Sequence, residues 1–172
     1  MTEPTRAVDP MIAELEQEAQ ATRRILERVP EDKLTWRPHS KSMTLGQLAG
    51  HVAGMFDISG FLEMDGLDID QVSFANPQPE SRAALLQTFE SSLAAARQRL
   101  GALDDCRAAH SWRLHKSGAE IFTMRKIDVM RTLLLNHLYH HRGQLSVYLR
   151  LLDVPLPVVY GRTADENPFA SM

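Results

Sequence analysis

The chain contains one cysteine, Cys106, among its 172 residues. A single cysteine excludes an intrachain disulfide and a cysteine-rich zinc site. Acidic and basic side chains nearly balance, which gives a formal net charge of −3, and lysine and arginine form no basic run. We therefore expect no binding to nucleic acid and no electrostatic attraction to an anionic membrane.

Long hydrophobic runs are also missing. No apolar stretch approaches the about 20 residues that a membrane-spanning helix needs. The N-terminal sequence MTEPTRAVDP has no signal-peptide core. The hydrophobic fraction of 44% and the charged fraction of 24% are ordinary for a globular protein. We expect a cytoplasmic protein whose residues 1–172 form a single domain.

Apolar residues recur at steps of three and four in four segments, whereas strand-like alternation is scarce. The segments begin at Asp9, at a Thr44–Gln47 capping box and at Ser81, and the last spans Ile127 to Leu152. Breaker-rich sequence from Gly66 to Glu80 separates the second from the third. These features predict an all-α fold, a four-helix bundle with a long crossover connection. Only Ser111 to Leu114 is compatible with a short extended piece.

Two histidines interrupt the apolar face of the last segment. His137 and His141 are four residues apart, so their side chains lie one turn above each other. Burying a polar group without a partner costs about 2–7 kcal/mol, so the pair needs hydrogen-bond partners or a metal ion. His140 lies three residues from His137, and spacing alone does not choose between His140 and His141. The apolar phase favours His141.

A further histidine, His51, lies beside the apolar face of the second segment. A lone histidine there is more often a hydrogen-bonded core residue than a ligand. His51 is a candidate ligand only because the last helix carries the pair His137 and His141. If His51, His137 and His141 meet, three neutral imidazoles suit a divalent first-row ion with an open coordination position. A hydrogen-bonded cluster without metal explains the same spacing equally well.

Two stretches carry a resemblance to a known family. The last helix contains NHLYHHRGQLSVYLRLLDVPLP and the second begins in WRPHSKSMTLGQLAGHVA. Both resemble the DinB-like (DNA-damage-inducible) superfamily, in the right order and spacing. The resemblance implies a four-helix bundle, commonly a homodimer, with a divalent metal ion, zinc or nickel, held by His51, His137 and His141. His140 then becomes a neighbour of the site.

Characterised members of that superfamily include thiol-dependent transferases and a thiol-dependent maleylpyruvate isomerase. The resemblance therefore implies a metal-dependent enzyme that joins a low-molecular-weight thiol, such as mycothiol, bacillithiol or glutathione, to an electrophile, or isomerises through a thiol adduct. The alternative is a non-catalytic stress-response protein with a structural or sensing metal site. A fourth ligand from the tail, Asp165 or Glu166, would favour the second interpretation. Apolar residues off the histidine face, Leu133, Leu135 and Tyr139, add to the expectation of a homodimer.

Overall fold

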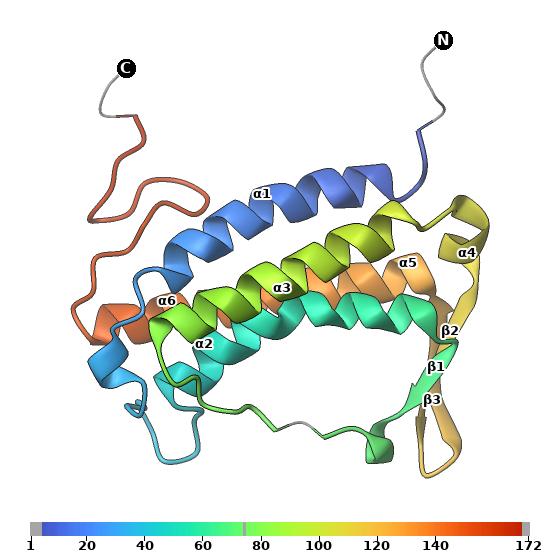
Figure 1. Cartoon of the computed structure of the whole chain (residues 1–172), viewed down its shortest axis with the longest axis horizontal. Coiled ribbons are helices and arrows are strands. Elements are labelled where there is room, and N and C mark those ends of the chain that lie inside the picture. Colours follow the sequence, from blue (N-terminus) through green and yellow to red (C-terminus); the bar gives the residue numbers. More distant parts are fainter. Residues whose placement is uncertain (1–4, 74, 170–172) are drawn as a thin grey trace.

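The computed structural model describes residues 5–73 and 75–169, so the first four residues of the N-terminal segment and the last three of the tail lie outside the description. In the described part, four long helical segments lie side by side (Figure 1). The colours show that α2 and α3 run in the same direction and that α1 and α6 run the opposite way. The segments are α1 (Asp9–Leu26), α2 (Leu45–Gly54) continued by η2 (Met55–Glu63), α3 (Arg82–Gly101), and a last helix of α5 (Lys126–Val129), η4 (Met130–Asn136) and α6 (His137–Leu151).

Short polar side chains begin α2 and α3 at the positions that the sequence predicts. The Thr44 hydroxyl accepts a hydrogen bond from the Gln47 backbone N–H at 3.1 Å, and the Gln47 side chain accepts one from the Thr44 N–H at 3.0 Å. The capping box of α2 is therefore confirmed. The Ser81 hydroxyl caps α3 by accepting from the Ala84 N–H at 3.1 Å.

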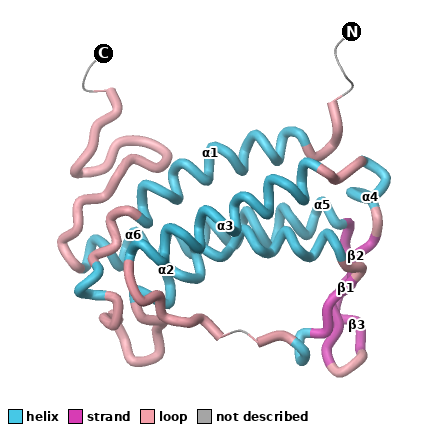
Figure 2. The backbone as a smooth tube through the Cα atoms, in the orientation of Figure 1, coloured by secondary structure: helices cyan, strands magenta, loops and turns pink. Residues whose placement is uncertain are grey.

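The predicted crossover connects α2 with α3. After η2 the chain returns along the length of the helices, mostly as loop, before α3 begins (Figures 1 and 2). Because α2 and α3 are parallel, a short connection could not join them. Short elements lie in the connections: η1 (Glu31–Lys33), η3 (Ile69–Gln71) and α4 (Asp105–Ala109). Within the described residues, no helix is both long enough and apolar enough to cross a bilayer.

A small sheet stands at one end of the helices, so the all-α prediction is wrong there. Its strands are β1 (Gly66–Asp68), β2 (Ser111–Lys116) and β3 (Ala119–Arg125), in that spatial order. β1 pairs parallel with β2, and β2 pairs antiparallel with β3. Ser117 and Gly118 join β2 to β3 with φ of 50° and 79°, as a tight two-residue hairpin turn requires.

The sheet closes that end of the core. Trp112 of β2 is fully buried, with its ring stacked on Phe61 at 5.4 Å between centroids and tilted against Phe122 at 6.3 Å. Lys126, at the start of the last helix, is 5% exposed and donates from Nζ to the Leu62 carbonyl at 3.1 Å. The aromatic contacts pack the sheet against the end of η2, and the Lys126 hydrogen bond joins the start of the last helix to the same part of η2.

The last helix is continuous, but η4 within it is a π-helix. A π turn holds more residues than an α turn, so the sequence positions that face the core are shifted after η4 relative to those before it. Buried positions before, within and after it include Val129, Met130, Leu134, Leu138, Leu145 and Leu149. His137 and His141 consequently lie at the edge of the buried face and are half-buried. The sequence pattern places the pair on the apolar face, and the structure places it at the margin of that face.

Candidate metal centre

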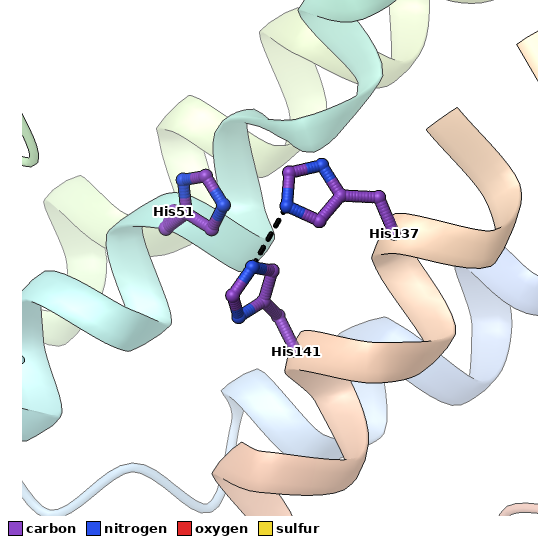
Figure 3. A group of neighbouring side chains, drawn as sticks. All are labelled: His51, His137 and His141. Atoms are coloured by element: carbon purple, nitrogen blue, oxygen red, sulfur yellow. Dashed lines mark hydrogen bonds between the residues drawn. The ribbon is translucent and has the colours of Figure 1, made fainter. Parts of the chain in front are cut away.

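Three histidines from two helices converge at the edge of the core (Figure 3). His51 projects from α2, while His137 and His141 project from α6, which packs against α2. The Nε2 atoms of His137 and His141 are 2.8 Å apart. The His51 ring centroid lies 5.2 Å from that of His137 and 4.5 Å from that of His141. One ring nitrogen of each residue lies within 4.8 Å of the other two.

The donor set fits a metal ion. Two imidazole nitrogens at 2.8 Å cannot face each other with both lone pairs free, so a proton or a cation belongs between them. Metal–imidazole bonds are about 2.0–2.1 Å long, so two nitrogens on one ion lie within about 4 Å of each other. A small side-chain adjustment brings the third nitrogen to that spacing. The histidines predicted to meet do lie together and could hold a metal ion.

A glutamine sets the tautomer of His141. The Gln144 side-chain oxygen lies 2.7 Å from Nδ1 of His141, so Nδ1–H donates to it and Nε2 keeps its lone pair for the cluster. Such a partner fixes both the orientation and the basicity of a ligating imidazole. Sequence reasoning missed this role, although the spacing of three residues on a helix was visible.

Burial lowers the pKa of all three imidazoles. For His141 burial lowers the pKa to about 4, against an opposing hydrogen bond to Gln144 and with added repulsion from the neighbouring histidines. The pKa of His51 is lowered first by burial and then by His137, against a contact with the Asn76 side chain. Burial is also the main cause of the lowered pKa of His137. Neutral imidazoles at pH 7 are the form that binds metals.

His140 and Cys106 do not contribute donor atoms to this group. His140 is exposed, with its ring centroid 4.8 Å from that of His141, and its nitrogens are not among the converging ones. Cys106 is exposed on α4, and its Sγ lies 3.7 Å from Nε2 of His110. Among the described residues, no carboxylate or thiol joins the three imidazoles.

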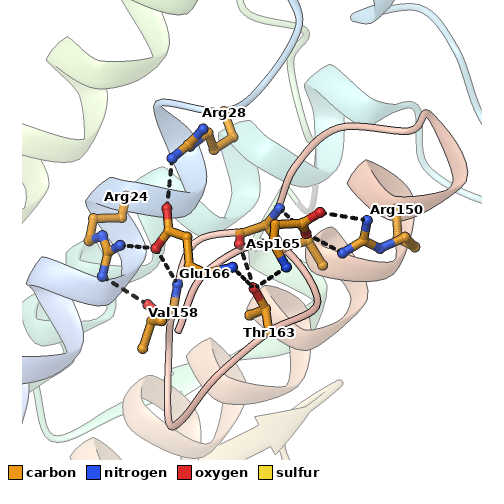
Figure 4. A network of polar contacts seen from close by, with 8 residues as sticks. Arg24, Arg28, Arg150, Val158, Thr163, Asp165 and Glu166 are labelled. Carbon is orange, nitrogen blue, oxygen red and sulfur yellow. Dashed lines mark hydrogen bonds and ion pairs between the residues drawn. The ribbon is translucent and has the colours of Figure 1, made fainter. Parts of the chain in front are cut away.

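The acidic residues of the tail are engaged elsewhere (Figure 4). Glu166 pairs with Arg24 of α1 and, at 2.9 Å, with Arg28, which follows the end of that helix. Asp165 pairs with Arg150 of α6 and accepts from a backbone N–H of the tail at 2.8 Å. Neither carboxylate supplies the fourth ligand that would have favoured a non-catalytic site, because both pair with arginines and hold the tail in place.

A buried ion pair beside the site locks α6 against α1. Arg142, which is 3% exposed, pairs with the Glu18 carboxylate. It also donates to the Glu18 carbonyl at 3.1 Å and to the Thr22 hydroxyl at 3.0 Å. The Tyr160 hydroxyl of the tail donates to the same carboxylate at 2.7 Å. The pair holds α6 against α1 at the residue next to His141.

Comparison with known proteins identifies the family of this chain. A family model for the DinB superfamily matches residues 14–145. The chain belongs to the DinB superfamily. A comparison with curated proteins finds no match. Solved structures of DinB-like proteins share the fold at sequence identities too low to transfer a function.

Three such structures cover most of the chain. A DinB-like protein from Bacillus cereus has a TM-score of 0.63 at 21% identity, over 87% of this chain and 95% of its own. A DinB-like protein from Bacillus subtilis has a TM-score of 0.66 at 16% identity, over 90% and 100%. A protein assigned to the DinB family from Exiguobacterium sibiricum has a TM-score of 0.63 at 19% identity, over 92% and 97%. The DinB-like fold thus includes nearly all of this chain.

Proposed function

We propose that His51, His137 and His141 hold one divalent metal ion, zinc or nickel, in a four-helix bundle that carries the sheet at one end. We further propose that the protein transfers a low-molecular-weight thiol to an electrophile, or isomerises a substrate through a thiol adduct. One observation carries this proposal: three imidazole nitrogens converge without a protein acid ligand among the described residues. Three protein ligands with a remaining open position are typical of catalytic sites.

The chemistry follows from the residues at the site. A divalent ion bound there would lower the pKa of a coordinated thiol, so that the thiolate is available near neutral pH. Gln144 holds His141 in the ligating tautomer, and burial keeps the imidazoles neutral. In the transfer, a sulfur–carbon bond forms, the bond to the leaving group breaks and the thiol proton passes to solvent. Cys106 is not the nucleophile in this scheme, because it lies on α4 and its Sγ is not among the donor atoms that converge at the three histidines.

The second candidate is a non-catalytic stress-response protein with a structural or sensing metal site. The observation that favours it is the origin of the ligands on two helices, α2 and α6, that are distant in sequence. An ion between them would tie the helices together and add its binding free energy to folding. Turnover distinguishes the two candidates.

A homodimer is also proposed, on a different surface from the one first expected. Leu135 is fully buried in the chain's own core, and the Tyr139 hydroxyl hydrogen-bonds to Glu14, so these residues leave little free apolar surface. Val147 and Leu151, one turn apart on α6, are 57% and 58% exposed. Their shared exposed face supports the proposal.

The test is a thiol-transfer assay with metal-loaded protein. Mycothiol, bacillithiol and glutathione are each incubated with the electrophile monochlorobimane, and conjugate formation is followed by fluorescence. We expect at least one thiol to react about tenfold or more faster than with His137→Ala, because the ligand set is incomplete in that variant. His140→Ala is the matched control and should keep the wild-type rate. Equal rates for wild type and His137→Ala with all three thiols would refute the transferase proposal.

A further inference from the structure

A cavity of about 330 Å³ lies between α2, α3 and residues 75–79 of the crossover. Its wall includes His51, the one residue of the histidine cluster that lines it. Met55 and Ile58 of η2 and Leu85 of α3 supply much of the apolar lining. A concave apolar site with a few polar groups is the usual form of a small-molecule site.

Glycines on α2 shape this cavity. A Cβ atom at Gly50 would lie 3.4 Å from the Pro77 carbonyl oxygen, so helix and crossover are in close contact there. A Cβ atom at Gly54, one turn further, would meet nothing within 4 Å. The crossover thus closes over α2 near Gly50 and leaves the space beside Gly54 empty.

The polar groups of the cavity are uncharged at neutral pH. Among its described lining residues there is no lysine, arginine, aspartate or glutamate. The polar side chains are His51, Asn76, Gln78 and Thr88, and Asn76 contacts the His51 ring. An anionic ligand group would lose its hydration here without gaining a cationic side chain, at a large cost in free energy. The cation expected near it, the proposed metal ion, would already hold the thiolate.

We propose that this cavity binds the electrophile of the thiol transfer, a neutral and largely apolar small molecule whose polar end faces His51 and Asn76. The inference rests on the proposed function for the identity of the reaction. The cavity itself is defined by the fold. A thiol that carries carboxylates or ammonium groups would approach the histidines from outside this cavity.

The test uses two fluorescent probes with the same aromatic body. N-phenylnaphthylamine is neutral, and anilinonaphthalenesulfonate carries an added sulfonate. We expect chelator-treated wild-type protein to bind one N-phenylnaphthylamine per chain and to bind the sulfonate about tenfold or more weakly, because no side chain that lines the cavity offers it a positive charge. Equal affinity for the two probes would overturn the inference that the ligand is neutral.

Gly54→Leu should fill the cavity and weaken binding of N-phenylnaphthylamine by about tenfold or more. The matched control is Gly101→Leu, because a Cβ atom at Gly101, at the end of α3, also meets nothing within 4 Å and lies outside the cavity lining. Thr88→Trp is a second filling variant at an exposed position of the wall. Circular dichroism and metal content are measured for each protein. Wild-type affinity in both folded filling variants would overturn the proposal.

The outcome separates this inference from the proposed function. If the probe binds with the expected pattern while no thiol is transferred, the cavity stands as a ligand site and the transferase proposal fails. If thiols are transferred at the wild-type rate by folded Gly54→Leu and Thr88→Trp proteins, the cavity is not the electrophile site and the metal chemistry stands.

Discussion

The buried ion pair of Arg142 and Glu18 leads to a quantitative prediction about stability. Arg142 is 3% exposed and Glu18 is 7% exposed. Arg142→Met removes the guanidinium but keeps an unbranched side chain of similar length. The Glu18 carboxylate then stays buried with the Tyr160 hydroxyl, at 2.7 Å, as its remaining side-chain donor from this network.

Removing one partner of a buried ion pair typically costs about 3–5 kcal/mol, because the other charge is left without compensation. Tyr160 continues to donate, so we expect the lower end, about 3 kcal/mol. For a chain of this length each kcal/mol shifts the melting temperature by about 2–4 °C, so Arg142→Met should melt roughly 6–12 °C lower. Adding Glu18→Gln removes the unpaired charge and should recover most of the loss.

Thermal and urea denaturation of chelator-treated protein measures both effects. The control is Arg150→Met on the same helix, because the Arg150 side chain is 43% exposed and its partner Asp165 is 24% exposed. An exposed pair of this kind contributes about 1 kcal/mol or less. If Arg142→Met were as stable as Arg150→Met, or if the double variant lost the sum of the single losses, the argument from burial would be refuted.

Three further predictions concern pH, the tail and assembly. Burial lowers the pKa of His141 to about 4. Between pH of about 6.5 and 4 the unfolded chain therefore binds a proton that the folded, metal-free protein does not, and the free energy of unfolding should fall as the pH falls through this range. In urea denaturation of chelator-treated protein, His141→Ala should show a shallower loss. Glu166→Gln weakens the pairs with Arg24 and Arg28, so limited proteolysis should cut the tail faster while the melting temperature changes little. An unchanged cleavage rate would contradict the conclusion that these pairs hold the tail in place. Light scattering of the wild-type protein should give twice the chain mass of 19.4 kDa, and Val147→Lys should give the mass of one chain. A wild-type monomer at micromolar concentration would refute the dimer.

Local chemistry made part of this fold predictable. The Thr44–Gln47 capping box and the Ser81 cap use contacts within three residues, so the sequence pattern alone indicates them. The juxtaposition of His137 and His141 follows from helical spacing in the same way. The position of His51 opposite them depends on how α2 packs on α6, and the resemblance, rather than the spacing, predicted it.

The remaining features arise from contacts that the local pattern does not encode. The π turn before His137 moves the buried face, which places His137 and His141 at its edge rather than at the predicted core positions. The strands are at most seven residues long and largely exposed, so their alternation is too weak to predict a sheet. Asn76 reaches His51 only because the crossover folds back over α2.

Metal analysis of protein purified without a polyhistidine tag tests the central claim most directly. We predict one zinc or nickel ion per chain, retained in His140→Ala and lost in His51→Ala, in His137→Ala and in His141→Ala. The three losses should be alike because each imidazole contributes one nitrogen to the same group. Wild-type protein that stays metal-free, and whose melting temperature is unchanged by added zinc or nickel, would contradict the account and leave a hydrogen-bonded histidine cluster.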